Sequence, residues 1–233
     1  MPRWNQLTEK LVWEATAGIR KRRNEVFLRC MNPLPTDKVL DLGSEDGSQI
    51  ATFYPYLERV YLADILERPM QRGVKRYGFA GYSVIERNGT LSFEDQSFDI
   101  VYCNSVIEHV TDQKFENQWD FLQKAHQHQR RFASEVMRVG RGYFVQTPNR
   151  HFPIESHALL PFVGYLPARQ NMSLARILKK YWIKKWFGEF HLLTRKDMKD
   201  YFPDATIIPE RFCGFVKSWI AYRPPPDAAA RLS

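Results

Sequence analysis

The sequence predicts an α/β fold built on a mostly parallel sheet with an antiparallel edge. Three features of its 233 residues indicate this: short apolar runs alternate with amphipathic segments over residues 37–148, a glycine-containing loop follows the first run, and two more β-rich runs lie near the C-terminus. Strands that alternate with helices form parallel sheets, whereas the final pair would form the antiparallel edge. The length suits one domain with a large core.

The expected elements follow in chain order. Residues 1–36 form a helical extension, since apolar side chains recur at near-helical spacing from Leu7 to Cys30 and prolines at 33 and 35 end it. The basic run at residues 20–23 is interpreted as its solvated face. Strands are expected at about 38–42, 59–63, 82–86, 99–103 and 142–147, and helices at about 47–54, 66–77 and 115–139. Strands at about 206–208 and 218–222 close the sheet, and residues 224–233 form a tail.

The loop after the first strand is the most informative feature of the chain. Residues 39–48 read VLDLGSEDGS, so an apolar run ends near an acid, turns at one glycine and reaches a second where a helix begins. Such glycines let the backbone approach a ligand, and the helix N-terminus presents unpaired N–H groups. Asp64 ends the second strand 23 residues after Asp41, where a carboxylate can accept both hydroxyls of a ribose. Together these features favour a nucleotide-like ligand.

A third piece gives the family. The strand at 98–104 (FDIVYCN) runs directly into SVIEHV at 105–110. The order of these pieces resembles class I S-adenosylmethionine-dependent methyltransferases, and most of all the bacterial type 11-like group, over residues 37–223. The resemblance implies a single domain over 1–233 with a doubly wound, Rossmann-like sheet: a cofactor-binding core at 37–148, a lid-like acceptor-side insertion at 149–191 and closing strands at 192–223. The implied cofactor is S-adenosyl-L-methionine.

The resemblance also assigns roles to residues. Around the methionine part of the cofactor it implies Asp41, Gly43, Ser44 and Gly47 from the loop, and Asn104 and Ser105 from the end of the fourth strand. Asp64 would hold the ribose, Ile65 would lie against the adenine, and Asn88 and Gly89 would form the turn beside the adenine amine. Two positions depart from the family pattern: Glu45 replaces a glycine, and Asn88 replaces an acid.

Methyl transfer needs a general base only when the acceptor must lose a proton. The ionisable candidates follow the fourth and fifth strands, at the edge where open α/β sheets bind ligands: Glu108, His109, His151, Glu155 and His157. His157 is the first candidate for the base and His109 a second. No metal site is expected, because His126 and His128 are two apart on a helix and point in different directions.

Charge and cysteine content limit the kinds of partner and the cellular compartment that are expected. The net charge of +8 divides into +4 for residues 1–36, −2 for 37–150 and +6 for 151–233. Basic flanks, with a lysine-rich and aromatic stretch at 174–187, suit an anionic or lipid-linked small-molecule acceptor or peripheral contact with an anionic membrane. Three scattered cysteines, no 18-residue apolar run and no signal core indicate a cytoplasmic protein.

The leading hypothesis is therefore a methyltransferase acting on a small molecule, glycan or lipid-linked intermediate. An RNA methyltransferase is the alternative prompted by the basic flanks, although no separate RNA-binding module is visible and nucleic acid is the less expected partner. Because Glu45 departs from the loop pattern, a methyltransferase-like binding protein without turnover is a third reading.

Overall fold

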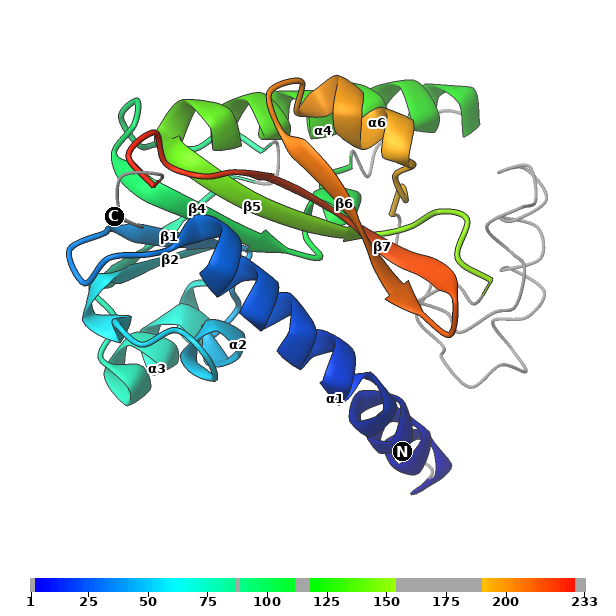
Figure 1. Cartoon of the computed structure of the whole chain (residues 1–233), viewed down its shortest axis with the longest axis horizontal. Coiled ribbons are helices and arrows are strands. Elements are labelled where there is room, and N and C mark those ends of the chain that lie inside the picture. The colour runs from blue at the N-terminus through cyan, green and yellow to red at the C-terminus, as the bar shows by residue number, and fades with distance from the viewer. Residues whose placement is uncertain (1–2, 87–88, 112–117, 154–189, 229–233) are drawn as a thin grey trace.

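The computed structural model describes residues 3–86, 89–111, 118–153 and 190–228, with the side chains of the first helix from residue 17 onward. The sheet has seven strands in the order β3-β2-β1-β4-β5-β7-β6 (Figure 1). Strands β1 to β5 pair with one another in parallel, and β7 is antiparallel to both β5 and β6. The predicted fold class is confirmed.

The strand bounds are β1 Val39–Leu42, β2 Val60–Asp64, β3 Gly81–Val84, β4 Phe98–Asn104, β5 Gly140–Pro148, β6 Thr206–Phe212 and β7 Phe215–Arg223. The α-helices are α1 Arg3–Met31, α2 Ser48–Ala51, α3 Glu67–Tyr77, α4 Gln118–Val139 and α6 Arg195–Tyr201. Two 3₁₀ turns are η1 Leu57–Arg59 and η2 Ile107–His109.

The helices cover both faces of the sheet. Helices α1, α2 and α3 lie on one side, and α4 and α6 lie on the other (Figure 1). Central strand β4 serves both layers, because Tyr102 packs with the first group and its neighbours Val101 and Cys103 pack with the second. This alternation explains why the strand reads as a continuous apolar run, as expected for a parallel strand buried on both faces.

Helix α1 is a single helix whose C-terminal half packs on the sheet. Ile19, Arg23, Phe27 and Met31 recur every four residues and are all buried, as the helical period requires for one face. The expectation that residues 20–23 form a solvated face holds for the exposed Lys21 and Arg22 but is wrong for Arg23, which is 6% exposed. Arg23 lies on the buried side because it falls midway between Ile19 and Phe27.

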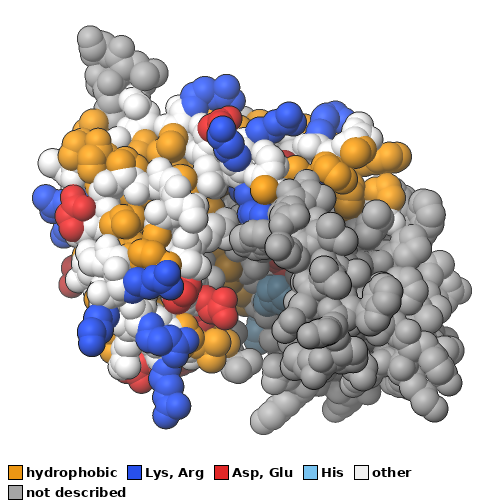
Figure 2. Space-filling model, turned by 90° about the horizontal axis from the view of Figure 1, so that it is seen from below, with side chains coloured by type: hydrophobic (Ala, Val, Ile, Leu, Met, Phe, Trp, Pro, Cys, Tyr) orange, Lys and Arg blue, Asp and Glu red, His pale blue; other side chains and the backbone are white. Residues whose placement is uncertain are grey.

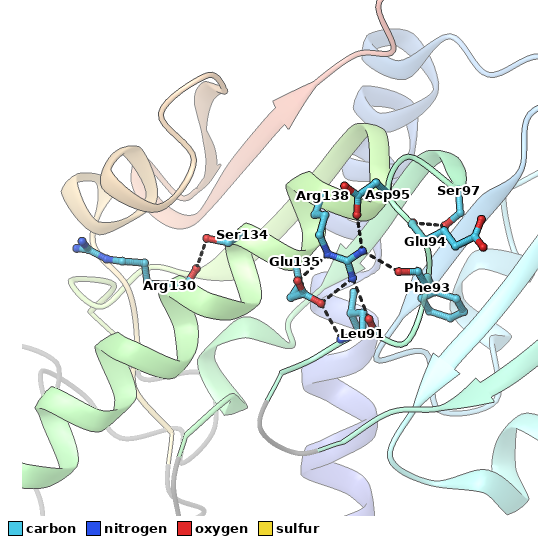
Figure 3. Close-up of polar contacts among 9 residues, drawn as sticks. All are labelled: Leu91, Phe93, Glu94, Asp95, Ser97, Arg130, Ser134, Glu135 and Arg138. Atoms are coloured by element: carbon cyan, nitrogen blue, oxygen red, sulfur yellow. Dashed lines mark hydrogen bonds and ion pairs between the residues drawn. The ribbon is translucent and has the colours of Figure 1, made fainter.

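The loop between β3 and β4 is tied to helix α4 by one arginine. The guanidinium of Arg138 donates to the backbone carbonyls of Leu91 and Phe93 and to the carboxylates of Asp95 and Glu135, at 2.7–2.9 Å (Figure 3). Glu135 in turn accepts from the Leu91 amide at 2.9 Å. These bonds fix the chain that leads from the β3 turn into β4.

The pairing of β5 with β7 completes the edge at which the parallel strands end. Pro148, the last residue of β5, is opposite Ser218, and Ser218 is opposite Glu210 of β6. The ends of β1, β2, β4 and β5 therefore lie on the same edge as the hairpin end of β6 and β7.

Of the lid-like insertion expected at 149–191, residues 154–189 lie outside the described residues, so the domain subdivision remains a prediction. In the described part of the chain, none of the helices has the length and apolar character needed to cross a bilayer.

Candidate cofactor site

The loop between β1 and α2 has a backbone that requires glycine at two positions. Gly43 has φ 74°, and a Cβ there would lie 2.3 Å from a methyl group of Val106. Gly47 has φ 70°, and a Cβ there would lie 2.5 Å from the Phe79 ring. The predicted loop glycines are thus needed both for their left-handed conformation and for the close packing of the loop.

Asp64 joins this loop to the end of β2. Its Oδ2 accepts from the Glu45 amide at 2.9 Å and its Oδ1 accepts from the Leu66 amide at 3.0 Å. Each carboxylate oxygen has a second lone pair, so these bonds orient the group without exhausting it. Ile65 follows directly and is 39% exposed, which leaves an apolar surface beside the carboxylate.

Asp41 is a second carboxylate at the same edge, and its environment is unusual. The side chain is 4% exposed, and no described residue forms a hydrogen bond with its carboxylate. Burial, with a further contribution from the charge of Asp64, raises the pKa of Asp41 to about 8. A buried carboxyl in this state is suited to a cationic ligand, which would favour its ionised form.

The end of β4 carries a polar network that the sequence did not predict. Asn104 Oδ1 accepts from Arg23 Nη1, and Asn104 Nδ2 donates to Gln49 Oε1 at 3.0 Å. Gln49 Nε2 donates to the Tyr102 hydroxyl at 3.1 Å. Neighbouring Ser105 has φ 56° and donates from Oγ to Gln146 Oε1 at 2.9 Å. Asn104 and Ser105 thus lie at the expected strand end, each oriented by an amide side chain.

Arg23 links this network to the far edge of the sheet. Its Nε and Nη2 donate to the two carboxylate oxygens of Glu210, at 2.8 and 2.7 Å, in a bidentate pair whose members are both buried. The Ser218 hydroxyl donates to the same carboxylate. The signal for Arg23 was present in the sequence as its four-residue spacing from Ile19 and Phe27, whereas Glu210 had no local signal.

The turn after β3 is described in part. Asn88 lies outside the described residues. Gly89 has φ 80°, and a Cβ there would lie 3.2 Å from Val110 and Phe132, so its described contacts are with the α4 side of the core. Among the loop residues, the Ser44 hydroxyl is buried with no hydrogen-bond partner in the described part of the chain.

The candidates for acceptor chemistry differ in their surroundings. His109 is exposed in η2, with its ring centroid 6.3 Å from that of Phe190. Glu108 is fully buried and accepts from the Thr147 hydroxyl at 2.9 Å, an arrangement typical of a structural carboxylate. His151 is exposed. Glu155 and His157 lie outside the described residues, so the roles of His109 and His157 stay predictions.

The structure holds no group of three or more metal-ligating side chains within the described ranges. His126 Nδ1 instead contacts the Tyr201 hydroxyl at 2.5 Å, and its ring lies 4.5 Å from that of His191. Burial, with smaller effects of His126 and Arg150, lowers the pKa of His191 to about 4. The lowered pKa keeps the His191 imidazole neutral near pH 7, and its ring packs against that of His126 on α4.

Comparison with known proteins identifies the domain. Residues 40–139 match the profile of a family described as a methyltransferase domain, the region that contains the loop, Asp64 and the end of β4. Residues 40–139 form a methyltransferase domain. The family predicted from the sequence is confirmed over these residues. Comparison with curated protein sequences gave no match.

Solved structures similar to this methyltransferase domain share its fold at low sequence identity. The PH0226 protein of Pyrococcus horikoshii OT3 has a TM-score of 0.56 and 16% identity over 93% of this chain and 91% of its own. Magnesium protoporphyrin IX methyltransferase (ChlM) of Synechocystis PCC 6803, with bound SAH, gives 0.52 and 15% over 91% and 85%. The N-methyltransferase NodS of Bradyrhizobium japonicum WM9, in complex with S-adenosyl-L-homocysteine, gives 0.51 and 11% over 89% and 88%.

Proposed function

We propose that this protein transfers a methyl group from S-adenosylmethionine to an anionic or lipid-linked small molecule or glycan. The observation that carries the proposal is the convergence of the glycine loop, Asp64 and Asn104 at one edge of a methyltransferase domain. Two proteins of the same fold were solved with S-adenosylhomocysteine, the product form of this cofactor.

The residues at this edge fit such a cofactor. A sulfonium supplies its own leaving group, so the protein has chiefly to bind, align and exclude water. The Asp41 carboxyl, buried and without a hydrogen bond to any described residue, is suited to the positive charge of the methionine part. Asp64 retains lone pairs for the ribose hydroxyls, and Ile65 offers apolar surface for the adenine.

The acceptor is proposed from charge. The segments on either side of the cofactor core carry +4 and +6, whereas residues 37–150 carry −2, so an anionic molecule is favoured over a cationic one. Peripheral contact with an anionic membrane belongs to the same proposal, and His109 or His157 would act only if the acceptor must lose a proton.

The basic flanks also favour RNA as a second candidate. On the described part of the face seen in Figure 2, however, Lys and Arg side chains are spread among apolar and acidic ones and do not form a continuous track. A basic patch or stripe on one face is the usual footprint of nucleic-acid binding, so RNA is an acceptor class that the transfer assay has to separate from small molecules.

The test is transfer of a labelled methyl group from S-adenosylmethionine to fractionated cell extract. Phosphorylated metabolites, glycans, lipids and RNA would be assayed separately, with Asp64→Ala as the matched control. We expect label in a small-molecule or lipid fraction with the parent protein and at least tenfold less with the variant. Label confined to RNA would favour the second candidate, and no label in any fraction would contradict the proposal.

A further inference from the structure

Helix α3 presents three cations to solvent on its outer face. Arg68, Arg72 and Lys75 are exposed and follow one another at spacings of four and three residues, so they lie in one row along the helix. The opposite side of α3 packs on the protein through Met70 and Gly73, which are both buried. Among the described residues, none forms a hydrogen bond or ion pair with any of the three cations.

The acid of α3 is turned toward the edge strand of the sheet. Glu67 Oε1 accepts from Gln71 Nε2 and from the Tyr82 hydroxyl, both at 3.2 Å, and Gln71 Nε2 also donates to that hydroxyl at 3.0 Å. Tyr82 belongs to β3, which is the edge strand. Helix and edge strand are therefore joined side by side at the surface of the protein.

Two exposed aliphatic side chains lie where this helix and this strand meet the end of β2. Leu66 directly precedes α3 and is 46% exposed, and Val84 ends β3 and is 50% exposed. Val84 is paired with Asp64, and the Leu66 amide donates to the Asp64 carboxylate at 3.0 Å. This corner of the molecule thus combines a row of cations with exposed aliphatic surface.

Helix α3 also supports the cofactor loop. A Cβ added to Gly73 would lie 2.1 Å from the Asp46 carbonyl oxygen, so the backbones of helix and loop are in direct contact. The helix begins at Glu67, three residues after Asp64 at the end of β2. A partner on the outer face of α3 would therefore lie beside the edge where cofactor and acceptor are proposed to meet.

We propose that the outer face of α3, with Leu66 and Val84, is the surface through which the protein contacts an anionic membrane. Anionic lipid headgroups attract the cations, and aliphatic side chains beside them enter the headgroup region. RNA is the less suitable partner, because single-stranded bases stack on aromatic side chains and this corner offers aliphatic ones. The proposal rests on the proposed function for its membrane partner, but the surface itself can be measured without turnover.

The experiment is co-sedimentation of the full chain with vesicles at low and at physiological salt. One set of vesicles is phosphatidylcholine, and the other contains equal parts of phosphatidylcholine and phosphatidylglycerol. The test variant removes the three cations of α3: Arg68→Gln, Arg72→Gln and Lys75→Gln. The matched control removes three exposed cations from α4 and α6, on the other side of the sheet (Figure 1): Arg131→Gln, Lys196→Gln and Lys199→Gln.

We expect the parent chain to bind the anionic vesicles, less tightly at physiological salt, and to leave the phosphatidylcholine vesicles unbound. The test variant should bind about a hundredfold more weakly, which is about fivefold for each cation. The control should change binding by less than about threefold, because charges far from the membrane are screened within a Debye length of about 8 Å. Arg68→Lys combined with Arg72→Lys keeps the charge and should bind like the parent. Leu66→Ser should weaken binding at both salt concentrations, since its contribution is apolar.

S-adenosylhomocysteine affinity, measured by calorimetry, should be the same in the parent, the test variant and the control. The membrane surface is contradicted if the parent does not bind anionic vesicles, if test and control variants lose binding equally, or if the test variant loses cofactor affinity as well. Binding of an RNA oligonucleotide that is lost in the test variant, without vesicle binding by the parent, would assign the surface to RNA and overturn the proposal. Vesicle binding by a chain that fails to bind S-adenosylhomocysteine would overturn the proposed function and support the membrane surface.

Discussion

At the scale of single residues, two carboxylates at one sheet edge have different tasks. Asp64 is held by two backbone amides, from Glu45 and Leu66. Asp41 is buried with no hydrogen bond from any described residue, and its pKa is raised to about 8. Asp64 organises the loop. Ionised Asp41 is unfavourable in its buried position, and a cationic ligand would stabilise its ionised form.

Asp41→Asn should remove a pH dependence of stability. An acid whose folded pKa is raised stabilises the fold below its unfolded pKa of about 3.9, and that contribution is lost as pH rises toward the folded value of about 8. The variant should therefore gain free energy of unfolding relative to the parent between pH 5 and pH 8, by at most about 1.4 kcal/mol per pH unit. Urea denaturation at several pH values measures this.

The control for Asp41→Asn is Asp95→Asn, whose side chain is 78% exposed and should show little of this trend. A difference between parent and Asp41→Asn that stays constant with pH would show that Asp41 is ionised throughout. Calorimetric titration with S-adenosylmethionine at the same pH values should give an affinity that rises toward pH 8 for the parent protein. The affinity of Asp41→Asn should not rise in this way.

Asp64→Ala should weaken cofactor binding by about 1.5–3 kcal/mol, the scale of a hydrogen bond to a charged group. It should also loosen the loop, because the amides of Glu45 and Leu66 lose their acceptor. Asp64→Asn keeps an acceptor oxygen and should lose less affinity than Ala. Calorimetry decides, and parental affinity in Asp64→Ala would exclude the ribose role.

At the scale of elements, the loop after β1 holds a non-glycine residue in a glycine conformation. Glu45 has φ 55°, and its position is the one where the resembling family has glycine. Glu45→Gly should therefore stabilise the fold by up to about 1 kcal/mol by removing left-handed strain, and should preserve or improve cofactor affinity.

Glu45→Gln separates strain from charge, since it keeps the Cβ and removes the carboxylate. Thermal unfolding should place it near the parent, with Glu45→Gly above both. Loss of all cofactor affinity in a folded Glu45→Gly variant would show instead that the Glu45 side chain binds the cofactor directly.

Helix α1 is joined to the sheet by the buried pair Arg23–Glu210. Arg23→Met should destabilise the protein by about 3–5 kcal/mol, because Glu210 would be left buried without its cation. Adding Glu210→Gln should recover much of that loss, and exposed Arg22→Met should change stability by less than about 0.5 kcal/mol. Urea denaturation compares the four proteins, and equal losses in Arg23→Met and the double variant would contradict the pairing.

The sequence predicted those parts of the site that depend on local pattern. The strands that carry Asp41, Asp64 and Asn104 follow from apolar runs, and the glycine loop follows from composition within ten residues. The Arg23–Glu210 pair joins positions 187 residues apart, and only the pairing of β6 with β7 beside β5 brings them together. Gln49 on α2 has no sequence pattern that marks it, because its role depends on contacts with Tyr102 and Asn104 of β4.

At the scale of the whole molecule, one sheet edge gathers every feature of the proposed activity. Parallel strands deliver the loop, Asp64 and Asn104, while the antiparallel hairpin of β6 and β7 delivers Glu210 and Ser218 to the same edge. Helix α1 spans these two groups through Arg23. In the sequence, residues 37–150 carry a net charge of −2, and the segments before and after them carry +4 and +6.

The most direct test of this account is calorimetric titration of the full chain with S-adenosylmethionine and S-adenosylhomocysteine, with NAD as the comparison ligand that shares adenosine. We predict one saturable site for the first two ligands, weaker binding in Asp64→Ala, and no comparable site for NAD. Absence of S-adenosylmethionine and S-adenosylhomocysteine binding at about 1 mM, a free energy weaker than about −4 kcal/mol, would contradict the central claim that this edge is a methyl-donor site.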